Sequence, residues 1–293
     1  MGALVRHASD EQKRRYLPEI AAGRLRLQAF AVTEPDAGSD TTRIKTSALR
    51  QGEAYLINGQ KVFISRVRQS DLMLLLARTA PYDEGRRGEG LSLFLVDLRE
   101  AGKTIDIQPI EMMLNHHTSQ LFITDLVVPA ENLIGEEGMG FRYIIDGWNA
   151  ERILLASEAI GDGRWFIERA VKYASEREVF GRKIGANQGV QFPIAQCYAA
   201  IEAASLMRWQ AAQLFDAGEP CGAEANMAKL LASQASWQAA NICLNTHGGY
   251  GFAADYDIER KFRETKLFEV APVNNNLILA YLGQNVLGMP RSY

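Results

Sequence analysis

The sequence predicts a multidomain α+β protein in which a β-sandwich or barrel-like domain precedes a C-terminal four-helix bundle. Two observations lead to this fold class. Between residues 25 and 134 the chain consists of short β-rich runs separated by turn residues. After residue 135 the apolar residues recur at helical spacing in long segments, as in helices that pack together. A chain of 293 residues has room for two domains.

A short helix is expected first. Ser9 and Gln12 bound a capping box, and the helix that follows should end near Gly23. Residues 1–24 are therefore assigned to an N-terminal helical segment.

The β domain is assigned to residues 25–135. Its clearest β-forming runs lie at 55–57, 61–64, 91–96 and 121–123. Asn58-Gly59 and Arg87-Gly88 are turn signals that should separate strands. The polar, glycine-containing stretch 81–90 should form a solvated hairpin tip.

The helical domain is assigned to residues 136–293. In its first helix one face is formed by Phe141, Ile144, Ile145 and Trp148, at positions i, i+3, i+4 and i+7. Further helices are predicted over 188–215, 223–245 and 276–287. Short connections between them favour an antiparallel bundle.

Composition excludes several classes of protein. The net charge of −3 argues against general nucleic-acid binding, and no apolar run is long enough to span a membrane. The start of the chain has no signal-peptide pattern. The three cysteines are far apart and predict reduced thiols in the cytoplasm. His116-His117 lacks further ligands at suitable spacing, so no metal is predicted.

The segment Phe30–Asp40 carries the most chemical information. A strand-like start runs into a loop in which Pro35 fixes one φ angle and Gly38 leaves the main chain open to close approach. Its three acidic residues exclude a basic phosphate cradle. These residues alone fit either a neutral, flat, hydrogen-bonding ligand or an ordinary acidic turn.

Several segments in the same order resemble the acyl-CoA dehydrogenase family. They are Phe30–Asp40, Phe63-Ile64-Ser65, Arg177–Gly181, Asn187-Gln188 and His247–Phe252. The resemblance implies FAD as cofactor and matches the family's β domain and C-terminal bundle. Most of the family's N-terminal helical domain has no counterpart in this sequence.

The resemblance assigns two sets of FAD contacts. Those expected near the isoalloxazine ring are Phe30, Val32, Thr33, Phe63, Ile64 and Ser65. Ser39 is also counted as a cofactor contact and should touch the substrate's pantetheine near the thioester. Those expected at the pyrophosphate and adenine, across a dimer interface, are Arg177, Phe180, Gln188, Asn245, Gly248 and Gly249. Taken alone, Phe63 also fits a core aromatic, Arg177 a solvated helix end, and the glycine pair a helix C-cap.

The catalytic base departs from the common family pattern. Many members carry a Glu in a Tyr-Glu-Gly-Thr segment before the last helix, and here that position is Pro272. Glu269, three residues earlier, should point elsewhere.

Helical spacing offers a substitute. The face formed by Phe141, Ile144 and Trp148 extends to Glu151, so a carboxylate falls on an apolar face beside Trp148 and Leu154. Burial would raise its pKa, as in a general base. A helix bend, or an ion pair with Arg152 that turns Glu151 to solvent, is the alternative. Isovaleryl-CoA and long-chain members carry their base on this helix in a similar Glu-Arg pair.

The predicted function is FAD-dependent α,β-dehydrogenation of an acyl-CoA to a trans-2-enoyl-CoA, as in fatty acid β-oxidation. Glu151 would be the base, Asn149 and Arg152 would touch CoA, and electron-transferring flavoprotein would accept the electrons. A homodimer or homotetramer is expected. The alternatives are an acyl-CoA oxidase or desulfinase on the same scaffold, and a non-catalytic FAD-binding subunit of a hetero-oligomeric dehydrogenase.

Overall fold

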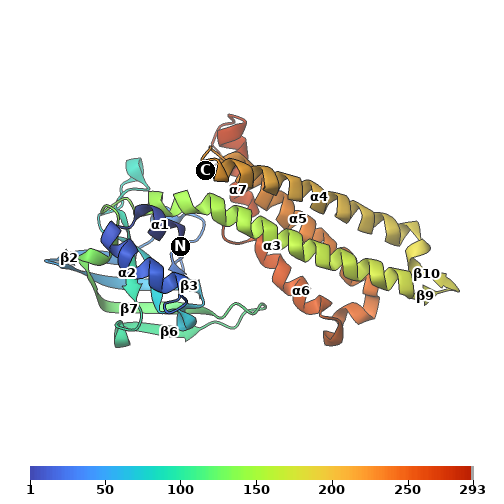
Figure 1. Ribbon diagram of the computed structural model, residues 1–293, viewed down its shortest axis with the longest axis horizontal. Coiled ribbons are helices and arrows are strands. Elements are labelled where there is room, and N and C mark those ends of the chain that lie inside the picture. The colour runs from blue at the N-terminus through green and yellow to red at the C-terminus, as the bar shows by residue number, and fades with distance from the viewer. Residues whose placement is uncertain (292–293) are drawn as a thin grey trace. The chain divides into compact units, whose positions relative to one another are not determined.

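The computed structural model describes residues 1–291 and divides into two compact units, Met1–Gly147 and Trp148–Tyr293 (Figure 1). The first contains a mixed β-sheet and the second is helical, which confirms the predicted fold class. The domain boundaries predicted at residues 24 and 135 stay predictions.

Two short helices open the first unit. They are α1, Gly2–His7, and α2, Asp10–Ala21. The predicted capping box is present, because Ser9 Oγ accepts from Gln12 N and the Gln12 side chain accepts from Ser9 N. Helix α1 has no strong sequence signal and was not predicted.

An eight-stranded sheet forms the body of this unit. Its strands are β1 Leu27–Ala31, β2 Ser47–Gln51, β3 Ala54–Ser65, β4 Leu72–Arg78, β5 Leu91–Asp97, β6 Ile105–Pro109, β7 Thr118–Pro129 and β8 Leu133–Ile134. Their order is β6-β7-β3-β2-β4-β5-β8, with β1 paired parallel to β4. The sheet's core includes Tyr55, Ile57, Phe94 and Leu121.

One turn prediction in this sheet is wrong. Asn58-Gly59 does not separate two strands but lies inside β3, which continues through both predicted runs with a register shift beside Gly59. A Cβ on Gly59 would lie 2.4 Å from Thr46 Oγ1 and 2.7 Å from Thr46 Cα. Glycine is therefore needed here for close packing rather than for a hairpin turn. The predicted tip at 81–90 does connect β4 to β5.

The second unit contains three long helices and two short ones within its described residues. The long ones are α3 Gly140–Glu176, which begins in the first unit, α4 Gln188–Asp216 and α5 Gly222–His247. The short ones are α6 Ile258–Thr265 and α7 Asn275–Tyr281. A small hairpin, β9 Glu178–Val179 and β10 Arg182–Lys183, joins α3 to α4.

Four details of the helices differ from prediction. Helix α7 ends at Tyr281, where the chain passes into a π turn over Leu282–Val286, and α6 was not predicted. Ile145 is exposed although Ile144 is buried, so the apolar face of early α3 is narrower than its pattern indicates. Leu154, expected beside Glu151 on the apolar face, is 69% exposed.

Candidate functional site

The loop after β1 is tied to β3 by a buried ion pair. Lys61 Nζ lies 3.0 Å from Glu34 Oε1 and 2.9 Å from the Val32 carbonyl oxygen. The Lys61 side chain is fully buried and that of Glu34 nearly so. The Glu34 carboxylate also accepts from the backbone N–H groups of Lys45 and Thr46, at 2.6 and 2.9 Å. The two segments predicted to meet the flavin ring are thus held together by charge-assisted hydrogen bonds.

Burial acts on the two ions in different ways. It lowers the pKa of Lys61 to about 8, although the Glu34 charge offsets part of that effect. For Glu34, burial raises the pKa, but the Lys61 charge and the hydrogen bonds outweigh it and hold the pKa below its usual value. Both groups are therefore mainly charged at neutral pH.

A β-bulge turns Phe63 outward at the end of β3. The register with β7 shifts between Lys61 and Ile64, and Phe63 has a left-handed φ of 60°. Its side chain is 57% exposed, whereas Ile64 is 2% exposed and belongs to the sheet's core. A phenylalanine in this left-handed backbone region carries strain, and here more than half of its side-chain surface is exposed. Ile64 could reach a ligand only through its backbone.

The other predicted ring contacts lie around this bulge and the β1 loop. Val32 and Thr33 are half-buried directly after β1, and Phe30 is half-buried within it. Ser65 is half-buried at the end of β3, with its Oγ 3.5 Å from Thr118 Oγ1. The Thr33 carbonyl accepts from Val62 N at 2.9 Å, which joins the loop and β3 through the backbone as well.

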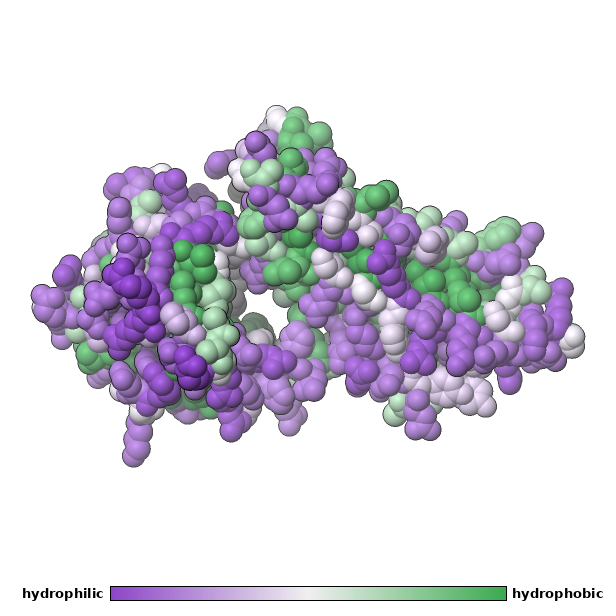
Figure 2. All heavy atoms as spheres, in the orientation of Figure 1, coloured by the Kyte–Doolittle hydropathy of each residue, from purple (hydrophilic) through white to green (hydrophobic). Residues whose placement is uncertain are grey.

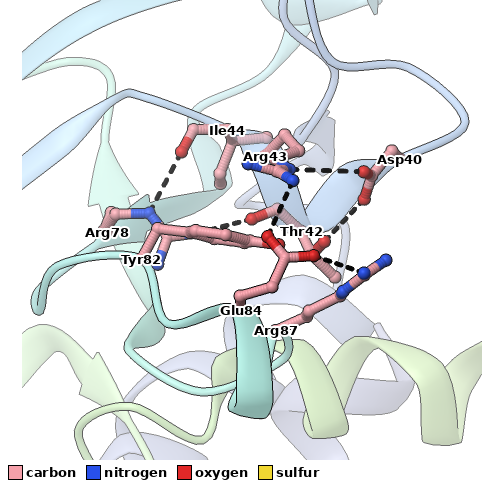
Figure 3. Close-up of polar contacts among 8 residues, drawn as sticks. All are labelled: Asp40, Thr42, Arg43, Ile44, Arg78, Tyr82, Glu84 and Arg87. Carbon is pink, nitrogen blue, oxygen red and sulfur yellow. Dashed lines mark hydrogen bonds and ion pairs between the residues drawn. The ribbon is translucent and has the colours of Figure 1, made fainter.

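The chain just beyond Ser39 is anchored to the β4–β5 connection (Figure 3). Arg78 donates to the Thr42 carbonyl at 2.6 Å, and the centroid of the Tyr82 ring lies 4.2 Å from the Arg43 guanidinium and 5.5 Å from that of Arg78. Asp40 accepts from Thr42 Oγ1 at 2.5 Å. These contacts fix where the loop ends, although the arginines themselves were not predicted.

In the helical unit, four predicted FAD contacts line one pocket of about 640 Å³. They are Arg177, Asn245, Gly248 and Gly249. A Cβ built on either glycine would meet nothing within 4 Å, so the chain's own packing does not require glycine there. Gly248 is the C-cap of α5, and its φ of 57° is one that favours glycine.

Phe180 and Gln188 do not line this pocket. Phe180 and Gly181 form the two-residue turn between β9 and β10, with φ values of 52° and 74°, the pattern of a type I′ turn. The Phe180 side chain is completely exposed. Gln188 is exposed at the first residue of α4. The turn strongly disfavours phenylalanine, so the stability of the chain does not explain why phenylalanine is present at position 180.

Three aromatic pocket residues were not predicted as site residues, although His247 and Tyr250 lie in the resembling segment His247–Phe252. Tyr173 stacks on His247 with ring centroids 4.2 Å apart, and Tyr250 lines the same pocket. His247 Nδ1 lies 2.8 Å from the Cys243 carbonyl oxygen, and burial lowers the pKa of His247, so the ring is neutral at pH 7. The available signal for Tyr173 is its position one helical turn before Arg177.

Glu151 lies on α3 with its carboxylate mostly buried. Within residues 1–291 no hydrogen bond or ion pair satisfies it. Burial raises its pKa, and the neighbouring Arg152 charge lowers it by less. The alternative ion pair with Arg152 does not form, because Arg152 Nη1 instead donates to Asn149 Oδ1 at 3.0 Å. Arg152 Nε is buried, and no acceptor for it exists in the described part of the chain.

The segment that carries the base in many relatives is occupied differently. Pro272 is exposed, and Glu269 is paired with Lys266. The next residues are held by buried Lys229, whose Nζ donates to the Val273 carbonyl at 2.7 Å and to Asn275 Oδ1 at 3.0 Å. Val273 belongs to a small apolar cluster against which Trp148, one turn before Glu151, packs. The Glu151 side of α3 and this segment therefore lie together.

No cluster of three or more His, Cys, Asp or Glu side chains within residues 1–291 could hold a metal ion. The helices over the same range include none that is both long and apolar enough to cross a membrane. All three cysteines are buried free thiols.

Two family models match the chain. One describes the middle domain of acyl-CoA dehydrogenases and covers residues 29–126, and the other describes their C-terminal domain and covers residues 138–285.

The chain is also similar to individual proteins of this family in sequence and in structure. The chain is 38% identical to acyl-CoA dehydrogenase FadE12 of Mycobacterium tuberculosis, over 99% of its own length and 74% of the relative's. It is 35% identical to the caffeyl-CoA reductase-Etf complex subunit CarC of Acetobacterium woodii, over 92% and 70%. The solved acyl-CoA dehydrogenase of Geobacillus kaustophilus superimposes with a TM-score of 0.92 at 30% identity, over 97% and 74%. A solved FAD complex of PigA gives 0.92 at 28%, over 98% and 74%.

Proposed function

Because the chain belongs to the acyl-CoA dehydrogenase family, we propose that it removes two hydrogens from an acyl-CoA thioester and forms a trans-2-enoyl-CoA. Its cofactor is FAD, as predicted from the sequence. The observation that carries the proposed reaction is the Glu151 carboxylate, which is mostly buried, has a raised pKa and belongs to a chain whose usual base position is Pro272.

The residues present fit a bound flavin. Phe63 and Phe180 are large aromatic side chains in left-handed backbone positions, and both are exposed in the chain by itself. Such strain is retained when a ligand or partner uses the side chain. Phe63 would cover the flavin ring beside Val32 and Thr33. Arg177 and the Gly248-Gly249 backbone would bind the pyrophosphate, because a guanidinium fork and open backbone suit phosphate oxygens.

Glu151 would remove a proton from the carbon next to the thioester carbonyl. Its raised pKa makes it a stronger base than an exposed glutamate, and no hydrogen bond within residues 1–291 occupies its carboxylate oxygens, which leaves them available for this proton. When bound, FAD supplies the acceptor for the hydride that leaves the adjacent carbon. The proton and the hydride together account for both hydrogens lost from the substrate.

Arg152 and Asn149 would bind the CoA portion of the substrate. The contact between them orients the guanidinium on α3, and the buried Arg152 Nε still lacks an acceptor among residues 1–291. A carbonyl or phosphate oxygen of the substrate would satisfy that donor. Ser39, at the end of the β1 loop, would contact the pantetheine chain.

A homodimer or homotetramer is part of the proposal. The helical unit presents apolar side chains at its surface (Figure 2), and those exposed on α4 are Phe192, Tyr198, Leu206 and Trp209. Large exposed apolar side chains at this density are typical of protein interfaces. An electron-transferring flavoprotein is the proposed acceptor, which the name of the relative CarC supports.

Anaerobic titration of the purified, FAD-loaded protein with a panel of straight and branched acyl-CoAs tests this function. Bleaching of the oxidised flavin by at least one thioester, with enoyl-CoA as product, is expected. No bleaching by any acyl-CoA would contradict it. Because CarC is named as a reductase, the same samples are reduced chemically and mixed with enoyl-CoAs. Reoxidation in that direction alone would assign the chain to reduction instead.

A further inference from the structure

Lys61 has a structural role that the proposed flavin contacts do not include. It is a fully buried ammonium group whose two oxygen partners, Val32 O and Glu34 Oε1, both belong to the loop after β1. It lies on β3 two residues before Phe63, so one side chain spans both segments assigned to the flavin ring.

The peptide plane between Val32 and Thr33 explains what this contact does. The structure's cis peptide bonds do not include this one, so its C=O and N–H point in opposite directions. Lys61 holds the Val32 carbonyl toward the interior at 2.9 Å. The Thr33 N–H is therefore directed away from Lys61, on the side of the loop that the proposed function gives to the flavin.

The next peptide is held in the same way. The Thr33 carbonyl accepts from Val62 N at 2.9 Å, and the Glu34 N–H donates to the Ala37 carbonyl at 3.1 Å. The Glu34 N–H therefore closes the loop on itself, whereas the neighbouring Thr33 N–H points outward. A cation behind the Val32 carbonyl also polarises the peptide, which makes the Thr33 N–H a better donor.

We propose that Lys61 is a positioning residue for FAD, which orients the Thr33 N–H and sets its donor strength through the Val32 carbonyl, with Glu34 as its buried counterion. This inference rests on the proposed function, since it takes the ring-binding side of the β1 loop as given. It adds a residue that would not touch the cofactor and would act only through the peptide between Val32 and Thr33.

The test compares FAD affinity in three variants. Lys61→Met removes the ammonium, and Glu34→Gln/Lys61→Met removes both charges so that neither is left buried alone. Lys45→Met is the matched control, because Lys45 forms an ion pair of similar length, 3.1 Å, with Asp36 in the same loop but with both side chains about three-quarters exposed. The dissociation constant of FAD is measured by titration of deflavinated protein, with circular dichroism to show that each variant is folded.

We expect FAD to bind about tenfold more weakly, or worse, when Lys61 is lost, since a charged hydrogen bond is exchanged for none. The double variant should show the same loss, and Lys45→Met should bind within about twofold of wild type. The midpoint potential of the bound flavin should also become more negative only in the Lys61 variants, because the reduced, electron-rich ring loses a polarised donor.

If Lys61→Met fails to fold, the FAD affinity of Glu34→Gln/Lys61→Met tests the positioning role instead. Wild-type affinity and an unchanged potential in either folded protein lacking Lys61 would overturn the positioning role, as would an equal loss in Lys45→Met. Wild-type protein that binds no FAD would overturn the proposed function as well, so the two failures are distinguishable.

Discussion

Lys61 Nζ lies 3.0 Å from Glu34 Oε1, with both side chains buried between β3 and the loop that follows β1. The pair joins two segments that are distant in sequence and that both resemble flavin contacts. Since an ion pair in the interior costs desolvation energy, it is weak evidence for stability by itself. Its position points to a role in holding the loop's geometry.

Removal of one partner of this pair should be costly. Lys61→Met leaves the Glu34 carboxylate buried without its counterion and should lower the free energy of unfolding by about 3–5 kcal/mol. Glu34→Gln/Lys61→Met should recover most of that loss. Urea denaturation measures both, and a double variant as unstable as the single one would show that the charges do not compensate each other.

Replacement of Phe180 should separate binding from stability. Phe180→Asn creates Asn-Gly, which the observed turn with φ values of 52° and 74° favours strongly. The free energy of unfolding should therefore stay constant or rise, while FAD binds more weakly because the exposed ring is lost. Thermal melting and FAD titration check the two effects. Unchanged FAD affinity would remove Phe180 from the site.

Two glycines of the sheet unit should respond differently to alanine. A Cβ at Gly59 would lie 2.7 Å from Thr46 Cα, a backbone atom that cannot move freely, so Gly59→Ala should cost about 1–3 kcal/mol of stability. Nothing lies within 4 Å of a Cβ at Gly38, so Gly38→Ala should change stability by less than about 0.5 kcal/mol. Chemical denaturation distinguishes them. Equal losses would contradict the close packing of β3 on Thr46.

The pH dependence of turnover should report Glu151. Burial raises the pKa of this carboxyl above its ordinary value of 4.5, and only the ionised form accepts a proton. The ratio kcat/KM should therefore rise with pH through an apparent pKa above 4.5 and then level off. An acid limb at or below the ordinary value would argue against this base.

Stability should follow the opposite course in the same pH window. The folded chain keeps the Glu151 proton to higher pH than the unfolded chain, so this residue's contribution falls as pH rises from 4.5 through the raised pKa. Glu151→Gln should remove that part of the slope in urea denaturation at several pH values.

Patterns that depend on local spacing could be read from the sequence. Side-chain type and a fixed period were enough to predict three features. They are the Ser9 capping box, the helices over 188–216 and 222–247, and the position of Glu151 on α3. The hairpin turn at Phe180-Gly181 carried no such signal, because phenylalanine is a poor residue for it.

Features that depend on tertiary contacts could not be read in this way. Asn58-Gly59 has the composition of a turn, yet close approach to Thr46 places it in a continuous strand. Lys61 has the sequence appearance of a surface residue, and only its partners Val32 and Glu34 explain its burial.

The most direct measurement is the single-turnover rate of flavin bleaching by the best acyl-CoA in wild type, Glu151→Gln and Glu269→Gln. Glu269 is the matched control because it is the other carboxylate near the usual base position but is already paired with Lys266. We expect Glu151→Gln to keep FAD and to bleach about 100- to 10,000-fold more slowly, while Glu269→Gln stays within a few-fold of wild type. A wild-type bleaching rate in Glu151→Gln, or the large loss in Glu269→Gln instead, would contradict the assignment of Glu151 as the base.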